Sequence, residues 1–300
     1  MEKQRNKEGS LPIGLRIIGI IIAVLAAAYG LYAGMGNSTG NFDGEMQIFA
    51  LDVGQGDSFF IISPNGKTML IDSGESSNSK QIEQFIREKG VRQLDVVIGS
   101  HTHSDHVGSM PYLLDAFDVG KYVMSEAGLE TRIQKRINAV LEEKDIPCSY
   151  VWAGDVIDWD SDCKVTVLSP VPEFDEYSKT DWNEWSLIIR AEYANHSMIF
   201  TGDATVRSEQ AAMLNNEKYL FDADVLKVPH HGSTTSSSLG FLEAVSPEYA
   251  IISVGKGNSY GHPDYDTIQK LKQVNAEIYR TDELGTINIV FSANDIKITY

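Results

Sequence analysis

The stretch "LDVVIGSHTHSDHVGS", residues 94–109, constrains the fold more than any other part of the chain. It opens with a nearly continuous apolar run, which predicts a strand buried on both faces. The run ends at a polar cluster formed by His101, His103, Asp105 and His106. Three of the 7 histidines of the chain therefore lie within this short segment. Functional groups of α/β proteins lie at the carboxyl ends of such strands. We therefore expect the cluster at the edge of a mixed sheet that is faced by helices.

The cluster has the composition of a metal site. His101 and His103 can both reach one metal ion as the chain leaves the strand, while Asp105 and His106 begin the next predicted helix and can reach a second ion. Two ions about 3.5–4 Å apart suit hydrolysis, because they activate a water molecule and stabilise developing charge. Imidazole and carboxylate ligands favour Zn²⁺, Mn²⁺ or iron over Ca²⁺. A surface loop that is merely rich in polar residues is the alternative.

The charge and the cysteine content exclude some classes of protein. A net charge of -17 argues against a passive nucleic-acid-binding module, because it repels phosphate at long range. It does not exclude an enzyme whose metal ions reverse the sign locally. Cys148 and Cys163 are too few for a disulfide scaffold, and the sequence leaves open whether they pair or remain free thiols.

The amino-terminal region predicts a membrane anchor. Residues 1–16 are basic, and residues 17–36 carry no charge over a length that spans roughly 30 Å as a helix. The basic tail should stay in the cytoplasm, which places the rest of the chain outside the membrane. A cleavable signal peptide, with a cleavage site at residues 26–28, is the alternative and would give a secreted protein. A polar linker, residues 37–45, follows.

From residue 46 to residue 300, short apolar runs alternate with helical periods, which predicts one domain of mixed sheets faced by helices. The predicted strands are residues 46–53, 57–63, 67–74, 94–100, 163–170, 185–193, 197–204, 223–233, 249–255, 276–282, 285–292 and 295–300. The predicted helices are residues 79–90, 130–144, 237–245 and 264–274.

Several of these segments resemble a known family. "HTHSDH" resembles the His-x-His-x-Asp-His signature of the metallo-β-lactamase fold, an αββα sandwich of the α/β (α+β) class. More narrowly, the chain resembles a stand-alone form of the extracellular hydrolase domain of the ComEC/Rec2-type DNA-uptake competence proteins. The resemblance covers residues 46–300 in family order and rests on "LDVGQGDSFFI", "TMLIDSG", "SHTHSDHVGS", "TGDA" with "LKVPHHGS", and "NSYGHP".

The resemblance implies a two-metal site that holds Zn²⁺ or Mn²⁺. Asp203 resembles the carboxylate that bridges the two ions, and His262 is expected to complete the shell of the second ion. The remaining metal ligands would be His101, His103, Asp105 and His106. Many relatives read His-x-Asp where this chain has His101-x-His103, which leaves the choice of metal open.

Four further residues receive supporting or catalytic roles. Asp72 resembles an aspartate that supports the metal ligands from behind, and Asp57 either lies near the site or caps a turn. Since side chains alternate along a strand, one of His230 and His231 should face the metal ions while the other packs behind. We expect His230 to face them and to protonate the leaving group, with Asp105 as the other catalytic residue; the roles of His230 and His262 could be exchanged.

These features predict a metal-dependent hydrolase of phosphodiesters, a phosphodiesterase or nuclease that acts outside the membrane, with DNA as one candidate substrate. The alternative enzyme is an amide or lactone hydrolase similar to β-lactamases, although no cysteine lies near Asp203 or the histidine pair in the sequence. A DNA-uptake binding module with a structural metal site is a third reading. His196 is predicted to be a solvated turn residue far from the metal ions, and the oligomeric state stays open.

Overall fold

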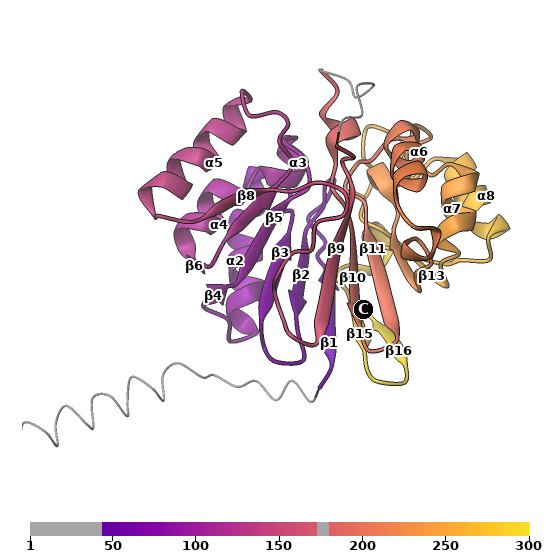
Figure 1. Cartoon of the computed structure of the whole chain (residues 1–300), viewed down its shortest axis with the longest axis horizontal. Helices are drawn as coiled ribbons and strands as arrows, with labels where there is room; N and C mark the ends of the chain where they lie inside the picture. The colour runs from indigo at the N-terminus through magenta and orange to yellow at the C-terminus, as the bar shows by residue number, and fades with distance from the viewer. Residues whose placement is uncertain (1–43, 173–179) are drawn as a thin grey trace, which may run out of the picture. The chain divides into compact units, whose positions relative to one another are not determined.

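Two sheets face each other and enclose the central core of the protein (Figure 1). Along the first sheet the strands follow the order β16 (Ile296–Thr299), β15 (Ile287–Phe291), β1 (Met46–Ala50), β2 (Phe59–Ile62), β3 (Thr68–Ile71), β5 (Val96–Gly99), β7 (Tyr122–Met124) and β8 (Cys148–Tyr150). Along the second the order is β14 (Glu277–Arg280), β13 (Tyr249–Ile252), β12 (Val225–Lys227), β11 (His196–Phe200), β10 (Ile188–Tyr193) and β9 (Cys163–Ser169). Apolar side chains such as Phe59 and Phe200 meet edge to face between the sheets.

Helices cover the outer face of each sheet (Figure 1). The first sheet packs against α2 (Ser79–Glu88), α4 (Met110–Ala116) and α5 (Arg132–Glu143). The second packs against α6 (Val206–Asn215), α7 (Leu239–Val245) and α8 (Tyr265–Gln273). The predicted αββα sandwich is therefore confirmed. We call the first sheet with its helices the first half, and the second sheet with its helices the second half.

Short elements complete the two halves. They are β4 (Gln93–Leu94), β6 (Asp118–Val119), α3 (Ser104–Val107), α9 (Thr281–Leu284) and the 3-10 helices η1 (Ser76–Asn78), η2 (Trp182–Trp185), η3 (Lys218–Leu220) and η4 (Pro229–Gly232).

Parallel strands gather the polar segments at one edge of each sheet. β3 and β5 are parallel neighbours in the first half, and β11 and β12 are parallel neighbours in the second. Carboxyl ends of parallel strands lie at the same edge of a sheet, where α/β proteins build their sites. Asp72 and His101 follow the two strands of the first pair, and Asp203 and His230 follow those of the second.

The computed structural model describes residues 44–172 and 180–300. The predicted anchor at residues 17–36 lies outside these ranges, and within them no helix is both long and apolar enough to cross a membrane. Cys148 and Cys163 are free thiols on strands of different sheets, which answers the question that the sequence left open.

Candidate metal centre

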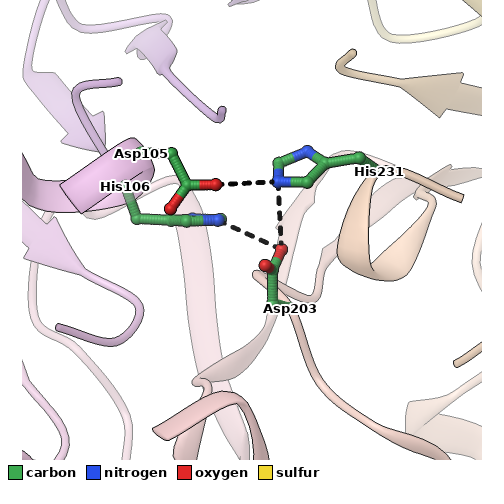
Figure 2. A group of neighbouring side chains, drawn as sticks. All are labelled: Asp105, His106, Asp203 and His231. Carbon is green, nitrogen blue, oxygen red and sulfur yellow. Dashed lines mark ion pairs between the residues drawn. The ribbon is translucent and has the colours of Figure 1, made fainter. Parts of the chain in front are cut away.

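Four side chains from the two halves converge on one point (Figure 2). Asp105 and His106 come from α3, Asp203 follows β11, and His231 lies in η4. His106 Nε2 is 3.1 Å from Asp203 Oδ1, and His231 Nε2 is 3.5 Å from both Asp203 Oδ1 and Asp105 Oδ2. The ligand-type atoms of the four residues all lie within 4.8 Å of one another.

These atoms fit a metal ion because most of them have no other partner. His106 Nε2, Asp203 Oδ1 and His231 Nε2 are buried and make no hydrogen bond within the described part of the chain. An unpaired buried polar atom costs free energy, and a cation bound between them would remove that cost. Imidazole nitrogens combined with carboxylate oxygens are a donor set for Zn²⁺ or Mn²⁺.

The two oxygens of Asp203 face two different groups of side chains. Oδ1 faces His106 and His231, whereas Oδ2 lies 4.0 Å from His101 Nε2 and 3.6 Å from His230 Nε2. His103 adjoins the second group, since its Nδ1 is 3.1 Å from His101 Nε2. A carboxylate with imidazoles on both oxygens has the arrangement that a bridge between two metal ions requires.

Hydrogen bonds behind two of the histidines fix which nitrogen faces the centre. The Nδ1 atom of His231 donates to the carbonyl oxygen of Ser253 at 2.8 Å, since a carbonyl can only accept. The Nδ1 atom of His106 lies 2.8 Å from Asp72 Oδ2. Both Nε2 atoms are therefore left free to bind a metal ion, as metal-binding histidines with such partners require.

Asp72 lies behind His106 and is itself held in place. Its carboxylate accepts hydrogen bonds from the backbone N–H of Ser100 at 2.8 Å and from the Ser100 hydroxyl at 2.7 Å. Burial raises the pKa of Asp72, and the charge of His106 opposes this effect. The carboxylate can thus orient the imidazole without binding a metal ion itself, and the supporting role of Asp72 stays a prediction.

Asp57 also lies at the site, and it pairs with a buried lysine. Its Oδ2 atom is 2.5 Å from Lys227 Nζ and 3.7 Å from His106 Nδ1. Asp57, Asp72 and His106 form a second group with ligand-type atoms. That group is a poor metal site, because the Lys227 ammonium already supplies its positive charge and His106 Nδ1 is engaged by Asp72. Asp57 therefore belongs to the layer that supports the centre.

The paired histidines do not follow the alternation of a strand, so this expectation is wrong. β12 ends at Lys227, and His230 (φ 51°, ψ 45°) and His231 (φ 54°, ψ 20°) both adopt the left-handed conformation. Both Nε2 atoms consequently lie near Asp203. His231, which we expected to pack behind, contributes to the converging group with a side chain that is 2% exposed, whereas His230 is 22% exposed.

His262 lies beside His230, and it is not one of the four converging residues. The two ring centroids are 5.8 Å apart, and His262 Nε2 is 4.0 Å from Asp264 Oδ2. Its role as a metal ligand stays a prediction. His196 begins β11, at the opposite end of the strand from Asp203, and packs half-buried against Phe291, so it is less solvated than we expected.

The carboxylates and histidines of the centre shift one another's pKa values. Burial would raise the pKa of Asp105, but the charges of His106 and His231 lower it to about 2. Burial would lower the pKa of His231, but Asp203, Asp105 and Asp57 raise it to about 9. His101 behaves in the opposite way, because burial dominates and holds its pKa well below the usual value. Carboxylates that raise the pKa of a neighbouring imidazole also favour a cation bound between them.

Comparison with known proteins decides the family. The chain matches the metallo-beta-lactamase superfamily over residues 51–256. It belongs to this superfamily. The chain is similar to ComE operon protein 3 of Bacillus subtilis, with 34% identity over 81% of this chain and 33% of that protein. It is also similar to Recombination protein 2 of Haemophilus influenzae, with 28% identity over 84% of this chain and 30% of that protein.

The resemblance to competence proteins is thereby confirmed, and this metallo-beta-lactamase chain spans about a third of the length of these relatives. Solved structures agree on the fold. The metallo-beta-lactamase fold protein YhfI of Bacillus subtilis matches with a TM-score of 0.53 at 13% identity, covering 85% of this chain and 99% of its own. Igni18, a metallo hydrolase of Ignicoccus hospitalis, matches with a TM-score of 0.54 at 14% identity, covering 82% of this chain and 100% of its own.

The family and the converging cluster together support a metal-dependent hydrolase. Sequence reasoning missed Lys227, although a signal was present: a lysine stands between apolar residues at the end of the buried strand "DVLKVP". A charged residue in such a run is rarely buried without a partner.

Proposed function

We propose that this chain is a phosphodiesterase that uses two divalent metal ions, with DNA as a candidate substrate. The observation that carries the proposal is the position of Asp203, whose two oxygens face imidazoles on both sides. A shared carboxylate of this kind would leave an open position at each ion for the oxygens of one phosphoryl group.

The residues that would hold the ions divide into two groups. Asp105, His106 and His231 would hold one ion, with Asp203 shared. His101 and His103 would hold the other from the opposite oxygen of Asp203, and His262 is the further candidate ligand. Zn²⁺ or Mn²⁺ would supply Lewis-acid chemistry here, by lowering the pKa of a water molecule and stabilising the charge that develops on the phosphoryl group.

His230 is the residue that we assign to the leaving group. Its Nδ1 atom is 2.9 Å from the hydroxyl of Thr235, which turns Nε2 toward Asp203. It is also the more exposed member of the histidine pair, so a substrate oxygen can reach it. Asp105, whose side chain is 28% exposed, is the second residue open to substrate, and we assign it to positioning the attacking water.

Two observations favour a phosphodiester over an amide or lactone. Neither cysteine belongs to the converging cluster, and Cys163 instead lies 4.0 Å from the sulfur of Met46. The names of the relatives, which include Recombination protein 2 and Competence protein ComA, point to work on DNA, a polymer of phosphodiesters. β-Lactam hydrolysis remains the runner-up activity.

A direct assay separates these readings. The full-length chain, loaded in turn with Mn²⁺ and Zn²⁺, would be offered bis-p-nitrophenyl phosphate, single-stranded DNA, double-stranded DNA and nitrocefin. We expect hydrolysis of the diester and of at least one form of DNA, and none in the Asp203→Asn variant. Nitrocefin turnover without diester turnover would overturn the proposal. DNA binding without any turnover would instead support a binding module with a structural metal site.

We further propose that the catalytic domain lies outside the cell membrane and is anchored by residues 17–36. The support is the uncharged run and the basic tail that precedes it. Protease added to intact cells should digest the chain beyond residue 36, and the amino-terminal fragment should stay with the membrane after a carbonate wash. Release of a shortened protein into the medium would instead indicate signal cleavage.

A further inference from the structure

Lys227 is buried at the centre of the site, although it belongs to neither group of candidate metal ligands. It is the last residue of β12 and is 1% exposed. Burying an ammonium group costs several kcal/mol unless charge and hydrogen bonds compensate for the lost water. The contacts of the ammonium group must therefore offset this cost, and they show which parts of the site it holds in place.

The ammonium group joins two loops that come from opposite halves. Nζ is 2.5 Å from Oδ2 of Asp57, which lies in the loop between β1 and β2. It also donates a hydrogen bond of 2.7 Å to the carbonyl oxygen of Gly202, in the turn after β11. Asp203 Oδ1 is 4.0 Å away, so Lys227 lies directly behind the proposed bridging carboxylate.

The Gly202 carbonyl is the point at which the second half of the site is held together. It accepts from Lys227 Nζ and, at 3.1 Å, from the backbone N–H of His230. Gly202 itself has φ +49°, and a Cβ atom there would stand 2.7 Å from the Ser100 hydroxyl oxygen. The turn is thus restricted to glycine, and its carbonyl direction is fixed by these two donors together with a longer contact of 3.4 Å from the Thr201 hydroxyl.

A further hydrogen bond links the ends of β11 and β12. The hydroxyl of Thr201 donates to the carbonyl oxygen of Lys227 at 2.8 Å. The ends of β11 and β12 are therefore linked in both directions, through the side chain of Lys227 and through its backbone. The two chain segments that carry Asp203 and the histidine pair cannot shift independently while these bonds hold.

We propose that Lys227 is a positioning residue of the metal centre, which acts through the Gly202 carbonyl to hold Asp203 and His231 at metal-binding distance. The inference rests on the proposed function, since it assumes that these residues bind metal ions. This role differs from neutralising the charge of Asp57, because we attribute the positioning of Asp203 and His231 to the hydrogen bond from Lys227 to Gly202 and not to the charge alone.

Variants that first remove the charge of Asp57 separate the two roles of Lys227, which are to neutralise Asp57 and to donate a hydrogen bond to the Gly202 carbonyl. In an Asp57→Asn background, Lys227→Gln keeps a side-chain N–H donor on a chain one bond shorter than that of lysine, whereas Lys227→Met keeps the apolar stem and has no donor. Both double variants avoid leaving an unpaired buried carboxylate, which the single variant Lys227→Met would do. Lys67→Met is the matched control, because it removes a lysine that pairs with Asp95 at 2.9 Å at the opposite end of β3 from Asp72.

The primary measurement is the affinity for Mn²⁺ and Zn²⁺ by competition with a chromophoric chelator, on full-length protein whose fold is checked by circular dichroism. We expect the Met double variant to bind metal about tenfold or more weakly than the Gln double variant, the size of effect typical of residues that support metal ligands. With bis-p-nitrophenyl phosphate at saturating metal, kcat should fall while KM changes little. The Lys67→Met control should match the wild type.

Equal metal affinity in the two double variants would overturn the inference, and so would loss of metal affinity that Asp57→Asn alone reproduces in full. A Met double variant that does not fold while the Gln double variant does would support the donor role. The chelator measurement needs no substrate, so a chain that binds metal normally but hydrolyses no diester refutes the proposed function and still tests Lys227.

Discussion

The two halves of the sandwich build their parts of the site in different ways. The first half supplies His101, His103, Asp105 and His106 from one short segment, at the junction of β5 and α3. The second half supplies Asp203 and His231 from separate turns whose conformations are unusual. A strand followed by a helix presents the first set with ordinary backbone geometry. The second set depends on Gly202, on Lys227 and on two consecutive left-handed histidines, so its position is more easily disturbed.

The largest effect should come from the residue that both groups of ligands share. We expect Asp203→Asn to lower metal content and to reduce diester hydrolysis by more than about a hundredfold, which is the upper end for residues that only support a ligand. Elemental analysis and the rate on bis-p-nitrophenyl phosphate measure this. His196→Ala, on the same strand but outside the site, is the control and should keep both. Undiminished metal in Asp203→Asn would refute the bridging role.

The next largest effects should distinguish His230 from His231, the two consecutive histidines with left-handed backbone. His231→Ala should lose metal and slow every substrate, because His231 is buried in the converging group. His230→Ala should keep its metal, hydrolyse the activated p-nitrophenyl diester fairly well, and lose roughly a hundredfold or more on DNA, whose leaving group needs a proton. Elemental analysis and parallel kinetics on the two substrates provide the test. If His230→Ala loses metal while His262→Ala and His231→Ala keep it, these assignments must be exchanged.

A smaller effect should follow from weakening the contact between Asp72 and His106 in the first half of the site. Asp72→Asn keeps the size of the side chain but weakens its hold on His106 Nδ1. We expect metal affinity to drop by about 10- to 100-fold while the fold is kept. Chelator competition measures the affinity, and Asp95→Asn is a comparison that should not change it, because Asp95 precedes β5 and contacts Thr68, at the opposite end of β3 from Asp72. An Asp72→Asn variant with wild-type affinity would show that the orientation of His106 does not depend on this contact.

The smallest effect concerns the loop that follows the histidine pair. Glu209 on α6 is buried and accepts hydrogen bonds from the backbone N–H groups of Ser237 and Ser238. Burial raises the pKa of Glu209 from 4.5 to about 7, against those hydrogen bonds. The folded state therefore binds the proton more tightly than the unfolded chain, and its stability should fall as the pH rises from about 4.5 to about 7.

The test is thermal unfolding of the metal-free protein between pH 5 and pH 8, with a chelator present. The wild type should lose more stability than Glu209→Gln over this range, because the variant has no group to ionise. Parallel curves for the two proteins would mean that the pKa of Glu209 is the same in the folded and unfolded states, which would refute the prediction.

The sequence marked most strands and the first half of the site, whereas the αββα architecture followed from the resemblance to the metallo-β-lactamase fold. Apolar runs at period two or continuous runs marked most strands, and "HTHSDH" after "LDVVIGS" was enough to place four residues together. The helix α6 was not predicted, because "VRSEQAAMLN" has no continuous apolar stripe and buries Ser208 and Glu209. Those two polar residues are buried only because the loops around them supply partners, and that information is not local.

The second half of the site could not be read in the same way. Alternation along a strand was the wrong rule for His230 and His231, since the backbone leaves the strand at Val228. Left-handed backbone at two non-glycine residues is costly and must be imposed by surrounding contacts. One such contact is the hydrogen bond from the His230 N–H to the Gly202 carbonyl, which joins residues that local propensity treats separately.

The joining of the two halves at the site also has a consequence for how the protein forms. The Ser253 hydroxyl donates to the carbonyl oxygen of Gly56 at 2.7 Å, and the two residues are 197 positions apart in the sequence. Contacts of such separation require long loops to close, so they form late in folding. A chain emerging from the ribosome can complete its first cluster of histidines early, yet the candidate metal centre stays incomplete until β11, β12 and β13 have been synthesised and docked. The candidate metal centre is thus complete only in the finished domain, and a truncated or misdocked chain would lack it.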